Sequence, residues 1–286
     1  MLFKPVPWAV SPYRTAVPSL YEDLAFITPF MQKQTGRGVM LGKNCSPLAG
    51  ANLTAGSTFQ WRSTPYGLGF GRTGTGNALI LSQNNFAPIV TSDGAGTGNF
   101  TLLMLANPVA ENVIATGFNQ SVDGGATATM ALSFNYNSSG AATAGWLMFY
   151  TRDAANGNGV TAAANLVDSD YHVYGIMRKG TLHSIWRDGI RRYTTTQTPR
   201  DIYVSGTSDL AFGSNAVTGV SAIKSATNIV LAAAWNEARS DDDMRLLGDD
   251  PFVMFRPTAP RKIYYLPAAS LANLALWYPR IRRRRR

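Results

Sequence analysis

The side chains that most often perform chemistry in proteins are scarce in this sequence. It has two histidines, His172 and His183, and one cysteine, Cys45. A zinc site normally takes three or four histidine or cysteine ligands, so carboxylates would have to fill most of its positions. A single cysteine excludes an internal disulfide. We therefore predict no metal site and no cofactor. Both histidines are interpreted as hydrogen-bonded strand residues, and a cross-strand pairing between them remains open.

Hydrolytic chemistry is not indicated either. No Gly-x-Ser-x-Gly motif is present to supply an activated serine. A glycosidase needs two carboxylic acids that flank the scissile bond, but glutamate occurs only at positions 22, 111 and 237, and Asp168 and Asp170 flank a predicted turn. Residues 69–74 fit Gly-x-Gly-x-x-Gly, yet strand-like sequence follows them, so we interpret them as a glycine-rich loop. We predict no catalytic residue and no enzymatic activity.

The densest group of carboxylates is the run Asp241, Asp242 and Asp243, which follows Ser240. Serine is a favoured N-cap, and carboxylates in the first turn face the positive end of the helix dipole. Gly248 can end such a helix, and Pro251 prevents its continuation. We therefore predict a short helix whose aspartates serve as caps. Metal binding by the three adjacent carboxylates is the alternative.

Aromatic side chains are the remaining candidates for ligand binding. They make up 11% of the sequence, and an exposed ring can stack on a sugar. Most of them are expected in the core or at an interface. The candidates for carbohydrate binding are Trp61, Trp146 and Trp186.

The positive charge is concentrated at the C-terminal end. Of the formal net charge of +9, six charges come from arginines among the last seven residues, which leaves +3 for the rest of the chain. Three interpretations remain open: a solvated tail, docking on an acidic patch of a neighbouring subunit or another protein, and contact with nucleic acid. The partner-binding candidates are Trp277, Tyr278, Arg280, Arg282, Arg283, Arg284, Arg285 and Arg286.

The elements that must position these residues are mainly strands. Charged residues are only 15% of the chain, and Lys and Glu, which usually coat helices, are rare. Short strand-like segments alternate with turn residues, which favours an all-β fold. Residues 170–196 predict a three-stranded meander with turns at 179–180 and 188–189, because Asp-Gly favours a type I′ hairpin turn. The other predicted strands are 77–83, 100–106, 112–118, 130–136, 146–151, 209–213 and 228–235.

Three regions are expected along the chain: an extended arm over residues 1–29, a sandwich domain over 30–257 and a basic tail over 258–286. Four prolines in the first 20 residues argue against both a helix and a signal peptide there. Residues 21–31 are expected to form a short helical turn. In the tail, 263–266 suggest an edge strand and 268–277 a short helix. No segment is apolar over about 18 residues, so no transmembrane helix is expected.

Several motifs resemble one known family. The meander DYHVYGIMRKGTLHSIWRDGIRR, the segment DLAFGSN at 209–215 and the run NIVLAAAWNEARSDDDMRLLGDDPFVMFRP at 228–257 are similar to the closing elements of concanavalin A-like or laminin-G-like jelly rolls. Residues 35–82 resemble the opening of that domain. The resemblance implies a jelly-roll β-sandwich with one short C-terminal helix. It transfers no calcium site, and the Glu-x-Asp-x-x-Glu motif of the laminarinase-like members is absent.

The closing segment looks most like copies of this module in tailed-bacteriophage proteins. That resemblance implies a non-enzymatic structural virion protein, of the decoration, fibre or spike type, anchored by its termini. It implies other virion proteins as partners, a homo-oligomer and location in the virion. The first alternative is a carbohydrate-binding adhesion module, and the second is a divergent glycoside hydrolase.

Overall fold

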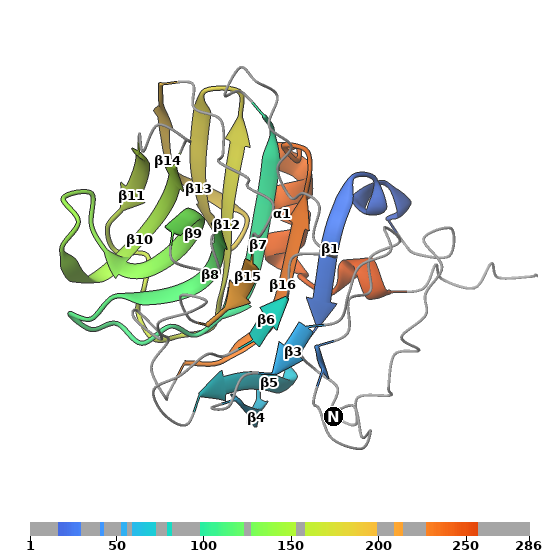
Figure 1. Cartoon of the computed structure of the whole chain (residues 1–286). Helices are drawn as coiled ribbons and strands as arrows, with labels where there is room; N and C mark the ends of the chain where they lie inside the picture. The colour runs from blue at the N-terminus through green and yellow to red at the C-terminus, as the bar shows by residue number, and fades with distance from the viewer. Residues whose placement is uncertain are drawn as a thin grey trace, which may run out of the picture. The chain divides into compact units, whose positions relative to one another are not determined.

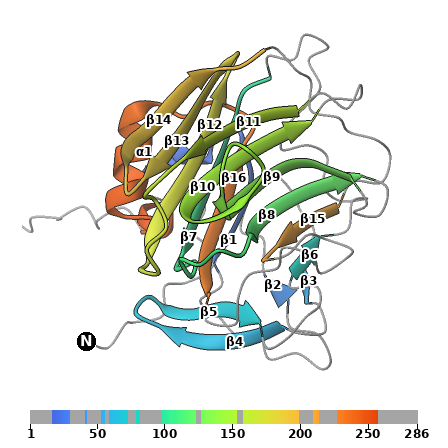
Figure 2. The same cartoon turned by 90° about the vertical axis from the view of Figure 1, so that its left-hand side faces the viewer.

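Two antiparallel β-sheets pack face to face in the computed structural model of the chain, as Figures 1 and 2 show. The structure describes residues 17–29, 41–42, 53–55, 59–72, 79–81, 98–122, 127–152, 158–198, 209–213 and 227–256. The prediction of an all-β sandwich with one short helix near its C-terminal end is confirmed. The strand and helix predicted within the tail lie outside the described residues.

One sheet carries the predicted meander at its edge. Its strands are, in spatial order, β14 (Ile190–Thr196), β13 (Leu182–Arg187), β12 (His172–Lys179), β7 (Phe100–Ala106), β16 (Ile229–Trp235), β5 (Gly67–Arg72) and β4 (Phe59–Thr64). An eighth strand, β1 (Leu24–Pro29), pairs with β16 on the side away from β7.

The second sheet contains the longer strands of the central sequence. Its order is β11 (Asn158–Ala163), β10 (Ala142–Arg152), β9 (Thr127–Tyr136), β8 (Ala115–Val122), β15 (Asp209–Phe212), β6 (Leu79–Leu81), β3 (Leu53–Ala55) and β2 (Leu41–Gly42). All its pairings are antiparallel.

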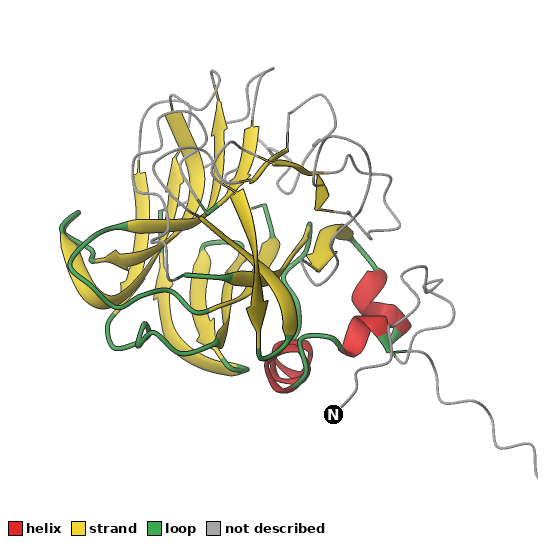
Figure 3. Cartoon of the chain, turned by 90° about the horizontal axis from the view of Figure 1, so that it is seen from below, coloured by secondary structure: helices red, strands yellow, loops and turns green. Residues whose placement is uncertain are grey.

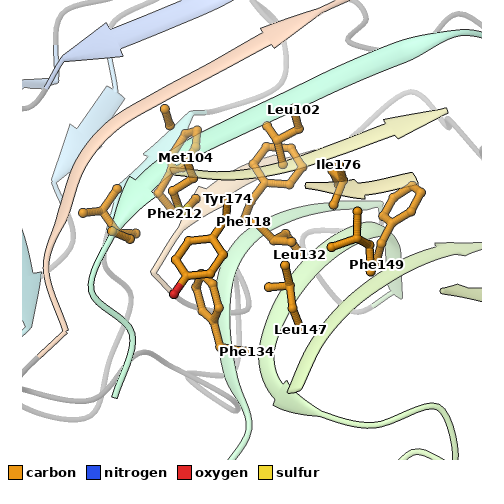
Figure 4. Close-up of a cluster of buried hydrophobic side chains, with 14 of the residues drawn as sticks. Leu102, Met104, Phe118, Leu132, Phe134, Leu147, Phe149, Tyr174, Ile176 and Phe212 are labelled. Atoms are coloured by element: carbon orange, nitrogen blue, oxygen red, sulfur yellow. The ribbon is translucent and has the colours of Figure 1, made fainter. Parts of the chain in front are cut away.

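Strand β7 is apolar on both faces because both faces are covered. Leu102 and Met104 point into the core between the sheets, where Figure 4 shows them among side chains of the opposite sheet. Leu103 and Leu105 belong to a second cluster on the outer face. Helix α1 (Asp241–Asp249) and the 3-10 helices η2 (Pro18–Tyr21) and η5 (Val253–Phe255) contribute to that cluster, and Figure 3 shows the helices outside the strand layers.

The N-terminal segment is a correction to the sequence analysis. Residues 24–29 form β1 instead of the expected helical turn, because Phe26 enters the central core while Ile27 enters the outer cluster. That alternation is the period of a strand. The preceding turn is fixed to the sandwich: Trp235 Nε1 donates to Leu20 O at 2.7 Å, and Tyr21 Oη donates to Met254 O at 2.6 Å.

The two hairpin turns of the meander have the backbone geometry that their glycines allow. Asp188 and Gly189 have φ values of 51° and 71°, so the predicted type I′ turn between β13 and β14 is confirmed. The first turn is centred on Gly180 and Thr181, one residue later than expected, since Lys179 still pairs with Leu182. Gly180 supplies the positive φ of 59° that this turn needs.

Helix α1 begins at the predicted cap. The Ser240 hydroxyl accepts from the Asp243 N–H at 3.1 Å, and Asp243 Oδ2 accepts from the Ser240 N–H at 3.3 Å. This capping box confirms the capping interpretation of Asp243. Met244 and Leu247 face the sheet and are buried. No helix among the described residues has the length and apolar character to cross a bilayer.

Replacing Ser240 by alanine is expected to lower the free energy of unfolding by about 1 kcal/mol, because the Asp243 N–H loses its acceptor. Denaturant unfolding of both proteins measures the difference. Ser240→Thr keeps a hydroxyl at the cap and should restore most of it. Equal stability of the alanine and threonine variants would contradict the capping role.

Candidate ligand-binding site

Helix α1 approaches the β13–β14 turn so closely that only glycines fit between them. A Cβ atom placed on Gly248 would lie 2.0 Å from Gly189 N and 2.3 Å from Gly189 Cα. A Cβ on Gly189 would lie 2.9 Å from Arg245 Cα. Figure 2 shows α1 beside β14 and β13. The Gly189–Gly248 contact therefore fixes the position of the helix on the sheet edge.

A cavity of about 530 Å³ lies at this junction. We call it the turn–helix cavity. The turn and the two strands that flank it supply one side, and α1 supplies the other. Its lining residues are Trp186, Asp188, Gly189, Ile190, Arg191, Asp241, Arg245 and Asp249. The lining thus combines an aromatic ring, an aliphatic side chain, two guanidinium groups and three carboxylates.

Arg191 links the two sides of the cavity. Its guanidinium carbon lies 4.9 Å from the centroid of the Trp186 ring, and its Nη2 forms an ion pair with Asp241 of α1. Trp186 is only 2% exposed, and its Nε1 has no hydrogen-bond partner among the described residues. The cation–π contact and the ion pair hold Arg191 across the indole, so Trp186 forms a covered part of the lining rather than a bare stacking surface.

A hydrogen-bond network holds the Asp188 carboxylate in place. Its Oδ1 accepts from the Val173 N–H at 2.9 Å, and its Oδ2 lies 2.6 Å from His172 Nδ1. His172 Nε2 lies 3.0 Å from Asp168 Oδ1, and Arg187 forms an ion pair with Asp168. These contacts orient the Asp188 carboxylate while the residue itself forms the turn.

Asp168 completes the network from the loop before β12. Burial on its own would raise the pKa of Asp168, but the Asp170 N–H and the side chains of Arg187 and His172 outweigh it and lower that pKa. Arg187 also donates to Leu166 O at 3.0 Å. Asp168 and Asp170 lie at a turn, as predicted, with the Asp170 N–H donating to Asp168 Oδ1 at 3.1 Å.

His183 lies elsewhere, on β13, where it is 3% exposed. Its Nδ1 is 3.3 Å from Thr161 Oγ1, and burial, together with the charge of Arg178, lowers its pKa to about 4. The interpretation of both histidines as hydrogen-bonded strand residues is confirmed. The alternative pairing between them is wrong, because His183 lies opposite Arg178 and His172 lies opposite Ala106.

The three tryptophans proposed for sugar binding come from separate places. Trp61 is on β4 and packs partly buried against the central core, and Trp146 is on β10 of the other sheet. Four strands, β12, β7, β16 and β5, separate β4 from β13, which carries Trp186. Of the three, Trp186 lines the turn–helix cavity. The partner-binding candidates in the tail lie outside the described residues.

Most residues of the turn–helix cavity were not identified from the sequence. Ile190, Arg191, Arg245 and Asp249 carry no motif that distinguishes them from ordinary surface residues. The usable signal was indirect: the Asp-Gly turn and the capped helix were both predicted, but nothing in the sequence placed one against the other. The contact depends on two glycines that are 59 positions apart, Gly189 and Gly248.

Solved structures that are similar in fold to this chain include toxin domains and a sialidase. The binding domain of Paraclostridial Mosquitocidal Protein 1 is 10% identical, with 82% of this chain and 53% of that one covered and a TM-score of 0.57. The receptor binding domain of botulinum neurotoxin D is also 10% identical, with 82% of this chain and 54% of that one covered and a TM-score of 0.56. A sialidase from Trypanosoma rangeli is 10% identical, with 82% of this chain and 33% of that one covered and a TM-score of 0.52.

No family model and no curated relative matches the sequence. The chain spans about half the length of the toxin domains that it resembles. At this level of identity the likeness concerns the fold alone. The chain therefore shares a β-sandwich architecture with binding domains and with one enzyme.

Proposed function

We propose that this chain is a non-enzymatic binding module that recognises a carbohydrate in the turn–helix cavity. The observation that carries the proposal is the composition of the lining, in which Trp186 and Ile190 lie beside three carboxylates and two guanidinium groups. Ligand sites in proteins are concave and combine apolar surface with a few fixed polar groups. A sugar presents apolar C–H faces together with hydroxyl groups, which both donate and accept hydrogen bonds.

The rigidity of the site supports the same proposal. Asp188 is fixed by the Val173 N–H and by His172, and Arg191 is fixed by Trp186 and Asp241. Polar groups that are already oriented lose little conformational entropy when a ligand binds. The likeness to chains described as receptor binding domains agrees with a recognition role, and it adds no ligand identity.

The finer assignments made from the sequence remain proposals. They are the concanavalin A-like or laminin-G-like family, the structural role in a tailed-phage virion and the anchoring of the chain by its termini. A binding module on a virion surface would combine carbohydrate binding with a structural role in the virion. The sandwich would be displayed, and the basic tail would attach to another virion protein or to a second copy.

Replacing Ile190 by asparagine is expected to weaken glycan binding about tenfold, because the exposed apolar contact in the cavity is lost. A glycan array identifies ligands, and calorimetry measures the affinity. Val113→Asn is the matched control: Val113 is 41% exposed and Ile190 is 53% exposed, and Val113 does not line the cavity.

Three results would contradict the proposal. The first is the absence of binding to every neutral, acidic and amino glycan at high protein concentration. The second is an equal effect of the Ile190 and Val113 variants on binding. The third is the release of reducing sugar from a bound glycan, which would make the module an enzyme.

A further inference from the structure

Within the turn–helix cavity, one charge is left without a counterpart. Arg191 pairs with Asp241, and Arg245 Nη1 donates to Asp242 Oδ1 at 3.0 Å. Asp188 is satisfied by Val173 and His172. Asp249 lines the same cavity, and its carboxylate has no hydrogen bond or ion pair with any described residue. Asp249 is exposed, so a ligand in the cavity can reach its carboxylate.

The position of Asp249 leaves its charge available to a cation, because Arg245, four residues earlier on α1, pairs with Asp242. Asp249 is the last residue of α1, where the helix dipole presents its negative end, and the last turn of this helix contains no basic residue. The neighbouring carboxylate of Asp250 is already paired with Arg256 at 2.8 Å. Over its whole lining, the cavity has three carboxylates and two guanidinium groups.

The donor set suits an organic cation better than a metal ion. Within the described ranges, no group of three or more His, Cys, Asp or Glu side chains is placed to hold a metal. A primary ammonium needs only one or two carboxylate oxygens, and it can keep its other hydrogen bonds to ligand hydroxyls or water. An ammonium at Asp249 would also bring the cavity to charge balance.

We infer that the turn–helix cavity selects glycans that carry a free amino group, with Asp249 as the residue that recognises the ammonium. This inference rests on the proposed function and specifies its ligand class. Hydroxyls and the sugar ring are bound by the remaining lining, whereas the amino group pairs with Asp249. N-acetylation removes the charge and adds bulk, so it should abolish the preference.

The test compares a β-1,4-linked glucosamine tetramer with its fully N-acetylated counterpart at about pH 6, where a primary amine is largely protonated. Calorimetry with the full chain should give at least tenfold tighter binding of the amino form. Asp249→Asn should reduce that ratio to near one, chiefly by weakening the binding of the amino form. Glu237→Gln removes one exposed carboxylate just before α1, outside the cavity lining, and should preserve the ratio.

The outcomes separate this inference from the proposed function. If both tetramers bind with equal affinity, or if the preference survives in Asp249→Asn, the inference is overturned while carbohydrate binding stands. If neither tetramer binds but other glycans do, amine selection is again overturned. If no glycan binds at all, the proposed function fails, and the inference fails with it. Loss of the preference in Asp249→Asn together with its retention in Glu237→Gln supports both.

Discussion

Replacing Gly248 by alanine is expected to destabilise the folded chain by about 3 kcal/mol, although alanine is the better helix former. The new methyl group would lie 2.0 Å from Gly189 N and 2.5 Å from Asp188 C. These are backbone atoms of a tight turn, so no side-chain rotation relieves the clash. Helix α1 must move away from the sheet and expose Met244 and Leu247, which are now buried. Thermal unfolding should show a Tm lower by about 10 °C.

A second glycine provides the control for this experiment. Gly180 also lies in a hairpin turn of the meander, at a φ of 59°, but a Cβ atom there would meet nothing within 4 Å. Gly180→Ala should therefore cost only the strain of a left-handed backbone, about 1 kcal/mol. If the two variants have the same stability, the close approach of α1 to the turn is not what holds the helix in place.

The second large effect is a loss of stability in acid that comes from His183. Burial lowers its pKa to about 4 in the folded state, from an ordinary value of 6.5. Between these two values the unfolded chain binds a proton that the folded chain does not, so the free energy of unfolding falls as the pH falls. The stabilising term is complete above pH 6.5 and is lost as the pH decreases toward 4. Its size is about 3 kcal/mol.

Denaturant unfolding at pH 7 and at pH 4.5 measures this term when wild type is compared with His183→Gln. The variant keeps a polar side chain beside Thr161 but does not titrate. Between pH 7 and pH 4.5 its free energy of unfolding should therefore fall less than that of wild type, and the difference should be most of the term of about 3 kcal/mol. Titrating groups common to both proteins cancel in the difference. Asp168 affects the free energy of unfolding only at lower pH, because its pKa is lowered from the ordinary value of 3.8. Identical pH dependence in the two proteins would contradict the buried, neutral state of His183.

The sequence predicted the elements whose signals are local. The residues of β7 were predicted without error, because an apolar run of strand length ends at turn residues on both sides. The type I′ turn at Asp188 and the cap at Ser240 each depend on a few adjacent residues. The N-terminal strand β1 was missed and a helical turn was expected in its place, because its pairing partner β16 lies about 200 positions away.

The candidate site was less accessible to prediction than the fold. Trp186 was identified because tryptophan is a distinctive residue type, but its cover by Arg191 could not be foreseen from the sequence. Asp249 belongs to a helix end that was predicted, and its role depends on which charges around it are already paired. Pairing is a property of three-dimensional contacts, so composition and spacing carry almost no information about it.

The Gly189–Gly248 contact has a consequence for how specificity can change over time. It holds the two sides of the turn–helix cavity together through backbone atoms, so neither Ile190 nor Asp249 is required for that task. Ile190 and Asp249 are exposed, and substitutions at such positions usually alter stability by less than about 0.5 kcal/mol. Under the proposed function, natural variants can therefore exchange these two residues and change the ligand while the scaffold is unaltered, which separates the evolution of recognition from the maintenance of the fold.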